Sequence, residues 1–283
     1  MIAFGDGEAT LCEGAPWERG PALLFCPADR PDRYASAAER ADAAIIDLED
    51  AVLPDARASA RAALASADLD PETTVVRINP LGTEDAAADL RVLASTAVRW
   101  VMVAKAEEAS AFDAVDERFR AIALCETARG VESAAAIARH PRVAALMWGA
   151  EDLVASLGGM SSRRPDGGYR DVARFARSRV LLAAGAVGKA AIDAVHLDID
   201  DLDGLSAEAE DAVASGFRAT ACIHPKQVPV IREAYLPTDS DIAWAAGVLA
   251  AAEKESGVFR FHGRMVDEPV LRHARAVLAR AGR

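Results

Sequence analysis

Short apolar runs alternate with alanine-rich amphipathic segments along almost the whole chain. The runs are nearly continuous in apolar residues and end at Pro, Gly or charged positions, which is typical of buried parallel strands. Eight such runs occur, at Ala22–Pro27, Ala43–Leu48, Thr74–Asn79, Trp100–Lys105, Ala121–Glu126, Ala144–Gly149, Ala191–Asp198 and Ala219–His224. Segments with helical spacing of apolar residues lie between them, among them Arg33–Arg40, Pro54–Ala67, Gly82–Ala94 and Gly130–His140.

This alternation predicts a (β/α)8 TIM barrel of the α/β class, because eight strand–helix units follow one another without a composition break. An open sheet that binds a dinucleotide would carry GxGxxG after its first strand, whereas the first run here ends in CPADRP. We expect an N-terminal extension over 1–20, a catalytic barrel over 21–239 and a C-terminal helical appendage over 240–283. The appendage has the pattern of two helices around a turn at Gly257–Gly263.

One connecting segment, Leu157–Tyr169, is rich in Gly, Ser and Arg and is predicted to be a long, mobile loop. Its composition fits a flexible surface loop and a cover for a bound substrate equally well.

Composition and charge narrow the class of partner. The 283 residues include 32 Lys and Arg against 44 Asp and Glu, a net charge of −12. A nucleic-acid partner is disfavoured because phosphate neutralisation needs clustered cations, whereas an anionic small molecule needs only a local basic group. The cysteines Cys12, Cys26, Cys125 and Cys222 lack metal-ligand spacing and are expected to be buried and reduced. With no signal-peptide pattern and no membrane-spanning run, we expect a cytoplasmic protein.

Ionisable residues follow the strands at the end where a TIM barrel places its chemistry. Every run after the first delivers at least one of them: Asp47, Glu49 and Asp50, Arg77, Lys105, Glu126, Glu151 and Asp152, Asp198, and His224. A mouth with so many carboxylates is costly unless their charges are paired or bind a cation.

The potential metal ligands at this mouth are oxygen atoms, which suit Mg²⁺, with Mn²⁺ as the alternative ion. Glu126 and Asp152 end adjacent strands, roughly 5 Å apart in such a sheet, and are predicted to share the ion. Zinc is disfavoured because His224 has no second His or Cys nearby in the pattern. Lys105 could form an imine with a keto substrate, but the surrounding carboxylates keep it protonated and a poor nucleophile.

Eight stretches carry a family resemblance. They are CPADRPDRYASA, ADAAIIDLEDAV, VVRINP, ETARGVESAAAIA, MWGAEDL, AIDAVHLDIDDLDGL, CIHPKQVPVIREAYLP and HGRMVDEPVLRHA. In this order, from Leu23 to Leu278, the sequence resembles the citrate lyase β-subunit-like (CitE-like) family of the HpcH/HpaI aldolase superfamily, close to the malyl-CoA lyases.

The resemblance implies roles for residues of the mouth. It implies that Glu126 and Asp152 hold Mg²⁺, that Arg77 contacts the substrate and stabilises an enolate oxygen, and that Glu49 and Asp50 lie close to the metal.

A late motif implies a shared site. Asp267, in GRMVD, is implied to reach the site of a neighbouring subunit in a homotrimer and to act there as acid or base; its position before Glu268-Pro269 also predicts a helix N-cap.

The resemblance further implies where the CoA thioester lies. Together with Arg77, Glu126 and Lys105, the implied substrate-binding residues are Pro27, Arg30, His224 and Pro225. Two motifs depart from the family pattern, since Ala28 stands where Gly is usual and the strand before Lys105 lacks its usual Pro.

The expected function is a Mg²⁺-dependent carbon–carbon lyase. It would cleave or form a 3-hydroxyacyl-CoA such as malyl-, citramalyl- or citryl-CoA, with an acyl-CoA and a 2-oxo acid as the products of cleavage. One alternative is an aldolase acting on free 2-oxo acids, against which the HGRMVDEP motif argues. A second is a citrate lyase β subunit acting on a citryl group on a carrier protein within a complex, which the sequence does not separate from a stand-alone enzyme.

Overall fold

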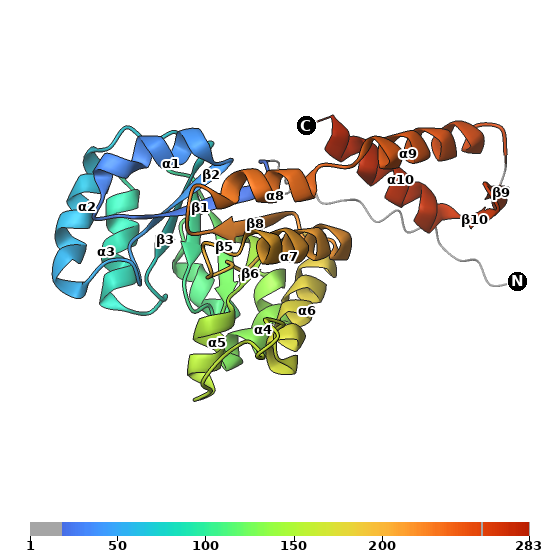
Figure 1. Cartoon of the computed structure of the whole chain (residues 1–283). Coiled ribbons are helices and arrows are strands. Elements are labelled where there is room, and N and C mark those ends of the chain that lie inside the picture. The colour runs from blue at the N-terminus through green and yellow to red at the C-terminus, as the bar shows by residue number, and fades with distance from the viewer. Residues whose placement is uncertain (1–18, 256, 283) are drawn as a thin grey trace, which may run out of the picture.

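A computed structural model describes residues 19–255 and 257–282. Eight parallel strands form a closed barrel in which each strand pairs with the next and β8 pairs with β1 (Figure 1). The strands are β1 (Ala22–Pro27), β2 (Ala43–Asp47), β3 (Thr74–Ile78), β4 (Trp100–Val103), β5 (Arg120–Cys125), β6 (Val143–Trp148), β7 (Ala190–Asp193) and β8 (Ala219–Cys222). The predicted TIM barrel is confirmed.

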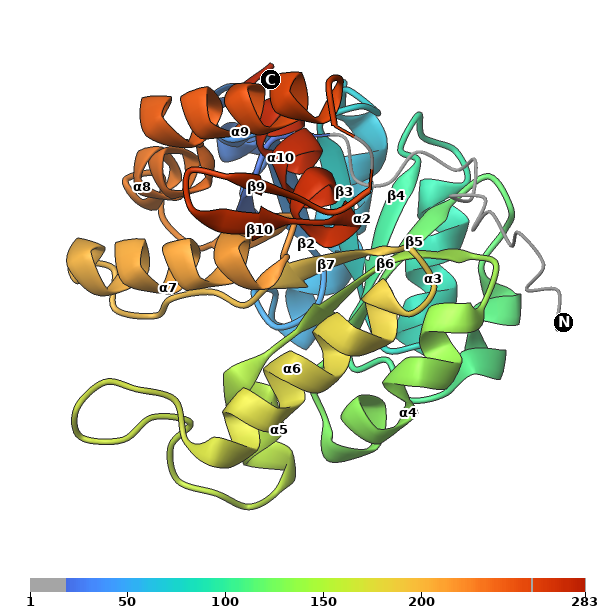
Figure 2. The same cartoon turned by 90° about the vertical axis from the view of Figure 1, so that its right-hand side faces the viewer.

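Helices surround the barrel and include all four segments that the sequence predicts (Figure 2). They are α1 (Tyr34–Arg40), α2 (Arg57–Ser66), α3 (Glu84–Leu93), α4 (Ala128–Arg139), α5 (Ala150–Ser156), α6 (Asp171–Gly185), α7 (Leu202–Ser215) and α8 (Gln227–Tyr235). Short 3-10 helices occur at η1 (Pro31–Arg33), η2 (Pro54–Ala56) and η3 (Ala109–Ala114), the last of which connects β4 to β5.

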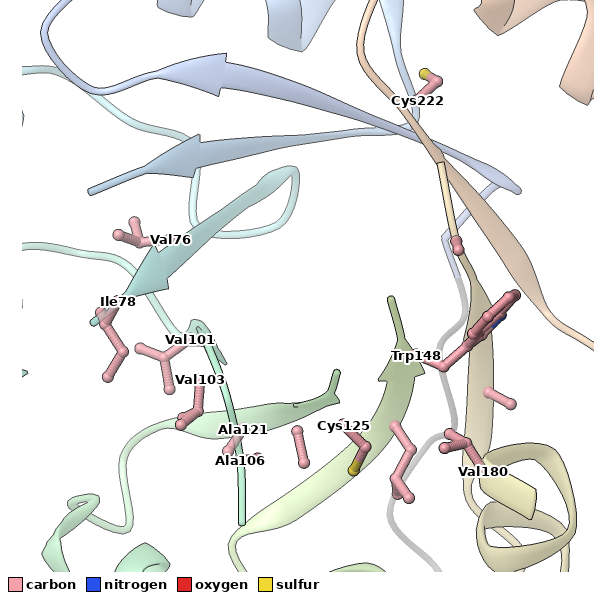
Figure 3. Packing of buried hydrophobic residues seen from close by; sticks show 14 of the residues in the cluster. Val76, Ile78, Val101, Val103, Ala106, Ala121, Cys125, Trp148, Val180 and Cys222 are labelled. Atoms are coloured by element: carbon pink, nitrogen blue, oxygen red, sulfur yellow. The ribbon is translucent and has the colours of Figure 1, made fainter. Parts of the chain in front are cut away.

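Side chains alternate between two cores because successive residues of a strand face opposite sides of the sheet. Leu23 and Ile45 lie among the residues that fill the inside of the barrel. Small side chains such as that of Ala219 pack between the larger ones there. Leu24 and Ile46 belong to the larger cluster between strands and helices. Figure 3 shows part of this outer cluster, and both clusters consist of buried residues.

The start of α4 illustrates how the sequence places a functional residue. Thr127 caps the helix by accepting a hydrogen bond from the Gly130 N–H at 3.0 Å, and Val131, Ala134 and Ile137 bury the inner face. Because only two residues, Glu126 and Thr127, separate β5 from the helix, Glu126 lies at the carboxyl end of the barrel.

The seventh strand is shorter than predicted. It ends at Asp193, because its pairing with β6 stops at Ile192 and its pairing with β8 stops at Asp193. The prediction that Asp198 ends this strand is therefore wrong, and Asp198 is an exposed loop residue. The alternating pattern AIDAVHLD continues beyond the point where neighbouring strands can pair with it.

The segment between α5 and α6 is a long loop, as predicted, and is anchored at several points. The hydroxyl of buried Ser162 donates to Glu151 at 2.6 Å, and Arg163 forms a two-pronged ion pair with Glu208 of α7. These contacts hold the middle of the loop against the helices on either side.

The C-terminal residues form a unit with a core of its own, which Figure 1 shows projecting to one side of the barrel. It contains α9 (Asp239–Ala252), the antiparallel hairpin β9 (Phe259–Phe261) and β10 (Arg264–Val266), and α10 (Glu268–Ala281). Both predicted helices are present. The predicted turn at Gly257–Gly263 is part of this hairpin, in which β9 precedes the turn residues His262 and Gly263.

Parts of the sequence analysis fall outside the described residues. The predicted N-terminal extension does so up to residue 18, and Cys12 with it. The three cysteines within the described ranges, Cys26, Cys125 and Cys222, are buried and unpaired, as expected. In residues 19–255 and 257–282 no helix combines the length and the apolar character that a membrane crossing requires.

Candidate active site

A pocket of about 400 Å³ opens at the carboxyl ends of the strands. Its floor is apolar and includes Phe25, Leu124 and Met147, which belong to the packing inside the barrel. Its charged lining residues come from the ends of several strands, the loops after them and the first turn of α5: Asp47, Asp50, Arg77, Glu126, Glu151 and Asp152. A charged rim above an apolar floor is the usual form of a small-molecule site in this fold.

Arg77 is the buried cation of the pocket. Its guanidinium donates from Nε to Asp47 Oδ1 at 2.6 Å and from Nη2 to Asp47 Oδ2 at 2.5 Å. Nη1 lies 3.3 Å from Glu49 Oε2, and the group stacks over Phe25 at 4.9 Å from the ring centre. The guanidinium is thereby fixed in one orientation on the wall of the pocket.

Lys105 lies among carboxylates from the loop after β2 and from the start of α5. Its ammonium contacts Glu49 and lies 3.4 Å from Asp50 Oδ2 and 3.5 Å from Asp152 Oδ1. Burial lowers the pKa of Lys105, but the hydrogen bond to Glu49 and the nearby negative charges outweigh it and raise the pKa above its ordinary value. The side chain therefore carries a charge at neutral pH and is a poor imine-forming nucleophile, as the sequence predicts.

Glu126 and Asp152 both line the pocket and lie near enough for their charges to interact. Glu126 is only 3 % exposed, and burial together with the charge of Asp152 raises its pKa to about 8. Gly149 makes room for it, because a Cβ at that position would lie 2.9 Å from Glu126 Oε2. Two carboxylates are thus held close together at a cost that a bound cation would remove.

The residues present fit a hard divalent cation. The carboxylates of Glu126 and Asp152 offer only oxygen atoms as donors, which is the donor set that Mg²⁺ prefers. Within the part of the chain that the structure describes, no group of three or more His, Cys, Asp or Glu could hold a metal ion. A cation on this pair would therefore complete its coordination with water or substrate.

The predicted residues divide into two groups. Glu49, Asp50, Arg77, Lys105, Glu126 and Asp152 come together at the pocket, and Pro27 lines its edge.

Arg30 instead pairs with Asp32 at 2.8 Å, with nearly half of its side chain exposed. His224 is exposed and Pro225 is half-buried; they follow Ile223, which lines the pocket.

Asp267 belongs to the C-terminal unit and is not part of the pocket lining. Its carboxylate accepts a hydrogen bond from the Val270 N–H at 3.3 Å and caps α10, as its position in the sequence predicts. Within a single chain, this side chain serves the helix.

Asp47 is the site residue whose role sequence reasoning misses. Each oxygen of its carboxylate accepts two hydrogen bonds. One comes from Arg77, and the other comes from the backbone N–H of Glu49 or Ala51, each at 3.0 Å. Its place two residues before Glu49 is a visible signal, but its pairing with Arg77 joins positions 30 residues apart.

A second buried network supports the same loops. Asn79 donates from Nδ2 to the Leu48 carbonyl at 3.1 Å and to Asp89 at 2.8 Å, and Asp89 also accepts from Arg61. Through the Leu48 carbonyl, this network fixes the backbone that carries Glu49.

A TIM barrel whose mouth combines an oxygen-donor pair with a fixed guanidinium has the layout of a barrel enzyme, whose active site lies at the carboxyl ends of the strands. The family described as HpcH/HpaI aldolase/citrate lyase matches residues 22–225. The chain belongs to this family and is a carbon–carbon lyase by class.

Similar proteins agree with this assignment. The citrate lyase subunit beta-like protein of Mycobacterium tuberculosis is 57% identical over 93% of this chain and 96% of its own. A (3S)-malyl-CoA thioesterase of Cereibacter sphaeroides is 34% identical over 85% of this chain and 87% of its own. The crystal structure of CitE from M. tuberculosis in complex with magnesium, acetoacetate and coenzyme A superposes with a TM-score of 0.89, at 56% identity, covering 94% of this chain and 99% of that one.

Proposed function

We propose that the protein is a Mg²⁺-dependent lyase that cleaves, or in reverse forms, a 3-hydroxyacyl-CoA thioester such as malyl-, citramalyl- or citryl-CoA. The products of cleavage are an acyl-CoA and a 2-oxo acid. The observation that carries the proposal is one pocket that combines the carboxylate pair of Glu126 and Asp152 with the fixed guanidinium of Arg77. The magnesium and coenzyme A bound to the M. tuberculosis protein support it.

Glu126 and Asp152 are the residues that would hold Mg²⁺, with Mn²⁺ as a substitute. When bound, the ion supplies Lewis-acid polarisation of the oxygen at the reacting carbon. Glu126 needs a cation for a physical reason, because its burial beside Asp152 disfavours its charged form.

Arg77 is assigned to the charge that develops on the substrate. In cleavage, a carboxylate takes the proton of the 3-hydroxyl group, C3 becomes the carbonyl carbon of the 2-oxo acid, and the C2–C3 bond breaks. The electron pair of the broken bond forms the enolate of the departing acyl thioester. A guanidinium that is already oriented stabilises the enolate oxygen without reorganising during the reaction. Asp47 provides that orientation through both of its oxygens.

The enolate carbon must then take up a proton, and we assign this acid/base role to Asp267 of a neighbouring subunit in a homotrimer. Asp267 lies outside the pocket of its own chain, while Glu49 is engaged by Lys105 and Arg77. Asp50 and Glu49 are the second choice, because both lie beside the pocket.

The thioester portion is assigned to the rim next to the pocket. Pro27 lines the pocket edge, and Arg30 follows it on the same loop. His224 and Pro225 come directly after the lining residue Ile223. With Lys105 at the acidic side, these residues would surround an acyl-CoA whose reacting end lies against Arg77.

The test is an assay of the purified protein with malyl-, citramalyl- and citryl-CoA, with and without Mg²⁺. The 2-oxo acid is followed as its phenylhydrazone, and free CoA thiol is followed in parallel with a disulfide reagent. A lyase releases a 2-oxo acid without free thiol, whereas a thioesterase such as the C. sphaeroides relative releases thiol.

Three controls sharpen the assay. EDTA should abolish turnover and added Mg²⁺ should restore it, while Asp152→Asn should stay inactive at any Mg²⁺ concentration. Turnover that is indifferent to EDTA would contradict the proposal, as would thiol release without 2-oxo acid. One of the two alternative functions would be favoured if no CoA ester is turned over but free 2-oxo acid aldols or a citryl carrier protein are.

A further inference from the structure

Lys105 joins the two halves of the acidic site through different atoms. Its backbone N–H donates to Glu126 Oε1 at 3.0 Å, while its ammonium, at the far end of the side chain, contacts Glu49. The same ammonium lies 3.5 Å from Asp152 Oδ1. A single residue therefore contacts both carboxylates of the proposed metal site and the acidic loop after β2.

The backbone of Lys105 is held in an unusual conformation. Its φ is +48°, in the left-handed region that glycine adopts readily and that lysine adopts only with strain. From this conformation the N–H and the ammonium reach separate carboxylates. A strained residue at a site of this kind points to a requirement for its side chain, because Gly would fit the backbone better.

The charges around Lys105 set up a competition. Its ammonium neutralises part of the negative charge of Glu49, Asp50 and Asp152. A divalent cation attracted by Asp152 would meet this fixed positive charge at the same carboxylate, and the two cations repel each other. A side chain with 29% of its surface exposed has room to turn away when that happens.

We propose that Lys105 is a built-in competitor of the divalent cation. It holds the acidic site together while the metal is absent, and it lowers the affinity of the site for Mg²⁺. This inference rests on the proposed metal site at Glu126 and Asp152. It adds control of metal binding to the place of Lys105 beside the substrate.

The experiment measures Mg²⁺ binding alone, by isothermal titration calorimetry, with no substrate present. Lys105→Met removes the charge and keeps the length of the side chain, whereas Lys105→Arg keeps the charge. We expect the Met variant to bind Mg²⁺ at least about tenfold more tightly than the wild type, and the Arg variant to stay near the wild-type affinity. Metal-free Lys105→Met should also melt at a lower temperature, because its carboxylates repel one another.

Two further variants serve as controls. Lys105→Gly removes the ammonium but keeps the backbone N–H and accepts the positive φ, so it should bind Mg²⁺ as tightly as Lys105→Met. Lys226→Met removes a rim lysine that pairs with Asp200, outside the pocket lining, and should leave Mg²⁺ affinity unchanged.

The outcomes separate the two ideas. If the wild type binds Mg²⁺ and Lys105→Met and Lys105→Gly bind it no more tightly, the competitor role is overturned and the metal site stands. Binding detected only in the variants without the ammonium supports it strongly. If neither the wild type nor any variant binds Mg²⁺, the metal site itself, and with it the proposed function, is overturned.

Discussion

The carboxylate of Asp47 and the guanidinium of Arg77 meet in two parallel hydrogen bonds, at 2.6 and 2.5 Å, across neighbouring strands of the barrel. Both groups are buried, so neither can exchange its partner for water without cost. The same carboxylate accepts two backbone N–H groups of the loop that carries Glu49. One side chain thus sets the direction of the cation and the position of the acidic loop together.

Replacing the carboxylate of Asp47 should impair the catalytic step more than substrate binding. In Asp47→Asn the amide nitrogen cannot accept from Arg77 Nη2, so the guanidinium loses one of its two bonds. We expect kcat to fall by about 10²-fold with a smaller change in KM, because a small misplacement of a catalytic group has effects of that size. Steady-state kinetics measures both constants.

The matched control is Asp55→Asn, an exposed aspartate shortly after the same strand, which should keep wild-type kinetics. Circular dichroism must show that Asp47→Asn is folded. A folded Asp47→Asn with unchanged kcat would show that Arg77 needs no such partner.

The assignment of Asp267 to a neighbouring subunit can be tested by mixing two inactive variants. Arg77→Ala destroys the pocket of its own chain, and Asp267→Asn removes the donated carboxylate while keeping a good N-cap for α10. In randomly mixed oligomers about a quarter of the sites combine an intact pocket with an intact Asp267. Co-expression of the two variants in equal amounts, with purification on a tag that both carry, should therefore restore activity to that fraction of the wild type. Mixed oligomers without activity would mean that Asp267 does not act across subunits.

Stability should depend on pH through His196, a buried residue of the loop after β7. Its hydrogen bond to Glu208, at 2.8 Å, raises its pKa above the ordinary value of 6.5, and Asp201 adds to the shift, while burial and Arg163 oppose it. A raised pKa means that the charged form stabilises the fold. This stabilisation is fully present below about pH 6.5 and is lost as the pH rises through the higher pKa of the folded state.

The measurement is the melting temperature of the wild type and of His196→Asn across this pH range. The difference between them should be largest at pH 6 and should shrink towards pH 9. His262→Asn is the control, because His262 is an exposed hairpin residue with φ of +45°, a conformation that Asn tolerates. A difference that stays constant with pH would show that the charge of His196 contributes nothing.

Loss of Asp89 should destabilise the barrel from within. This fully buried carboxylate accepts from the Asn79 N–H at 2.9 Å, from Asn79 Nδ2 at 2.8 Å and from Arg61 at 2.7 Å. Asp89→Ala leaves these donors without an acceptor, so the free energy of unfolding should fall by about 3 kcal/mol. Urea denaturation measures it. Asp68→Ala, at an exposed position, should change it by less than about 0.5 kcal/mol; equal effects of the two would contradict the argument.

Particular residues show how much of the fold and of the site can be predicted from the sequence. The barrel is predictable because its strands are nearly continuous apolar runs, and the pocket residues follow from their positions at strand ends. Phe259–Phe261 and Arg264–Val266 were missed as strands because three residues carry no periodicity. The role of Asp47 depends on a pairing with Arg77 in another strand, which no local pattern encodes. The same holds for Arg163, a residue of the long loop whose partner Glu208 lies on α7.

The separate core of the C-terminal unit has a consequence for how the protein responds to heat. The unit is small, and α9 and α10 pack chiefly on each other. A small core melts more readily than a large one, so two transitions are expected in calorimetry. Because Asp267 belongs to this unit, catalysis would cease at the first transition, while the ellipticity of the barrel is still intact. Thermal inactivation would then report on the smallest core of the molecule and not on the barrel that holds the pocket.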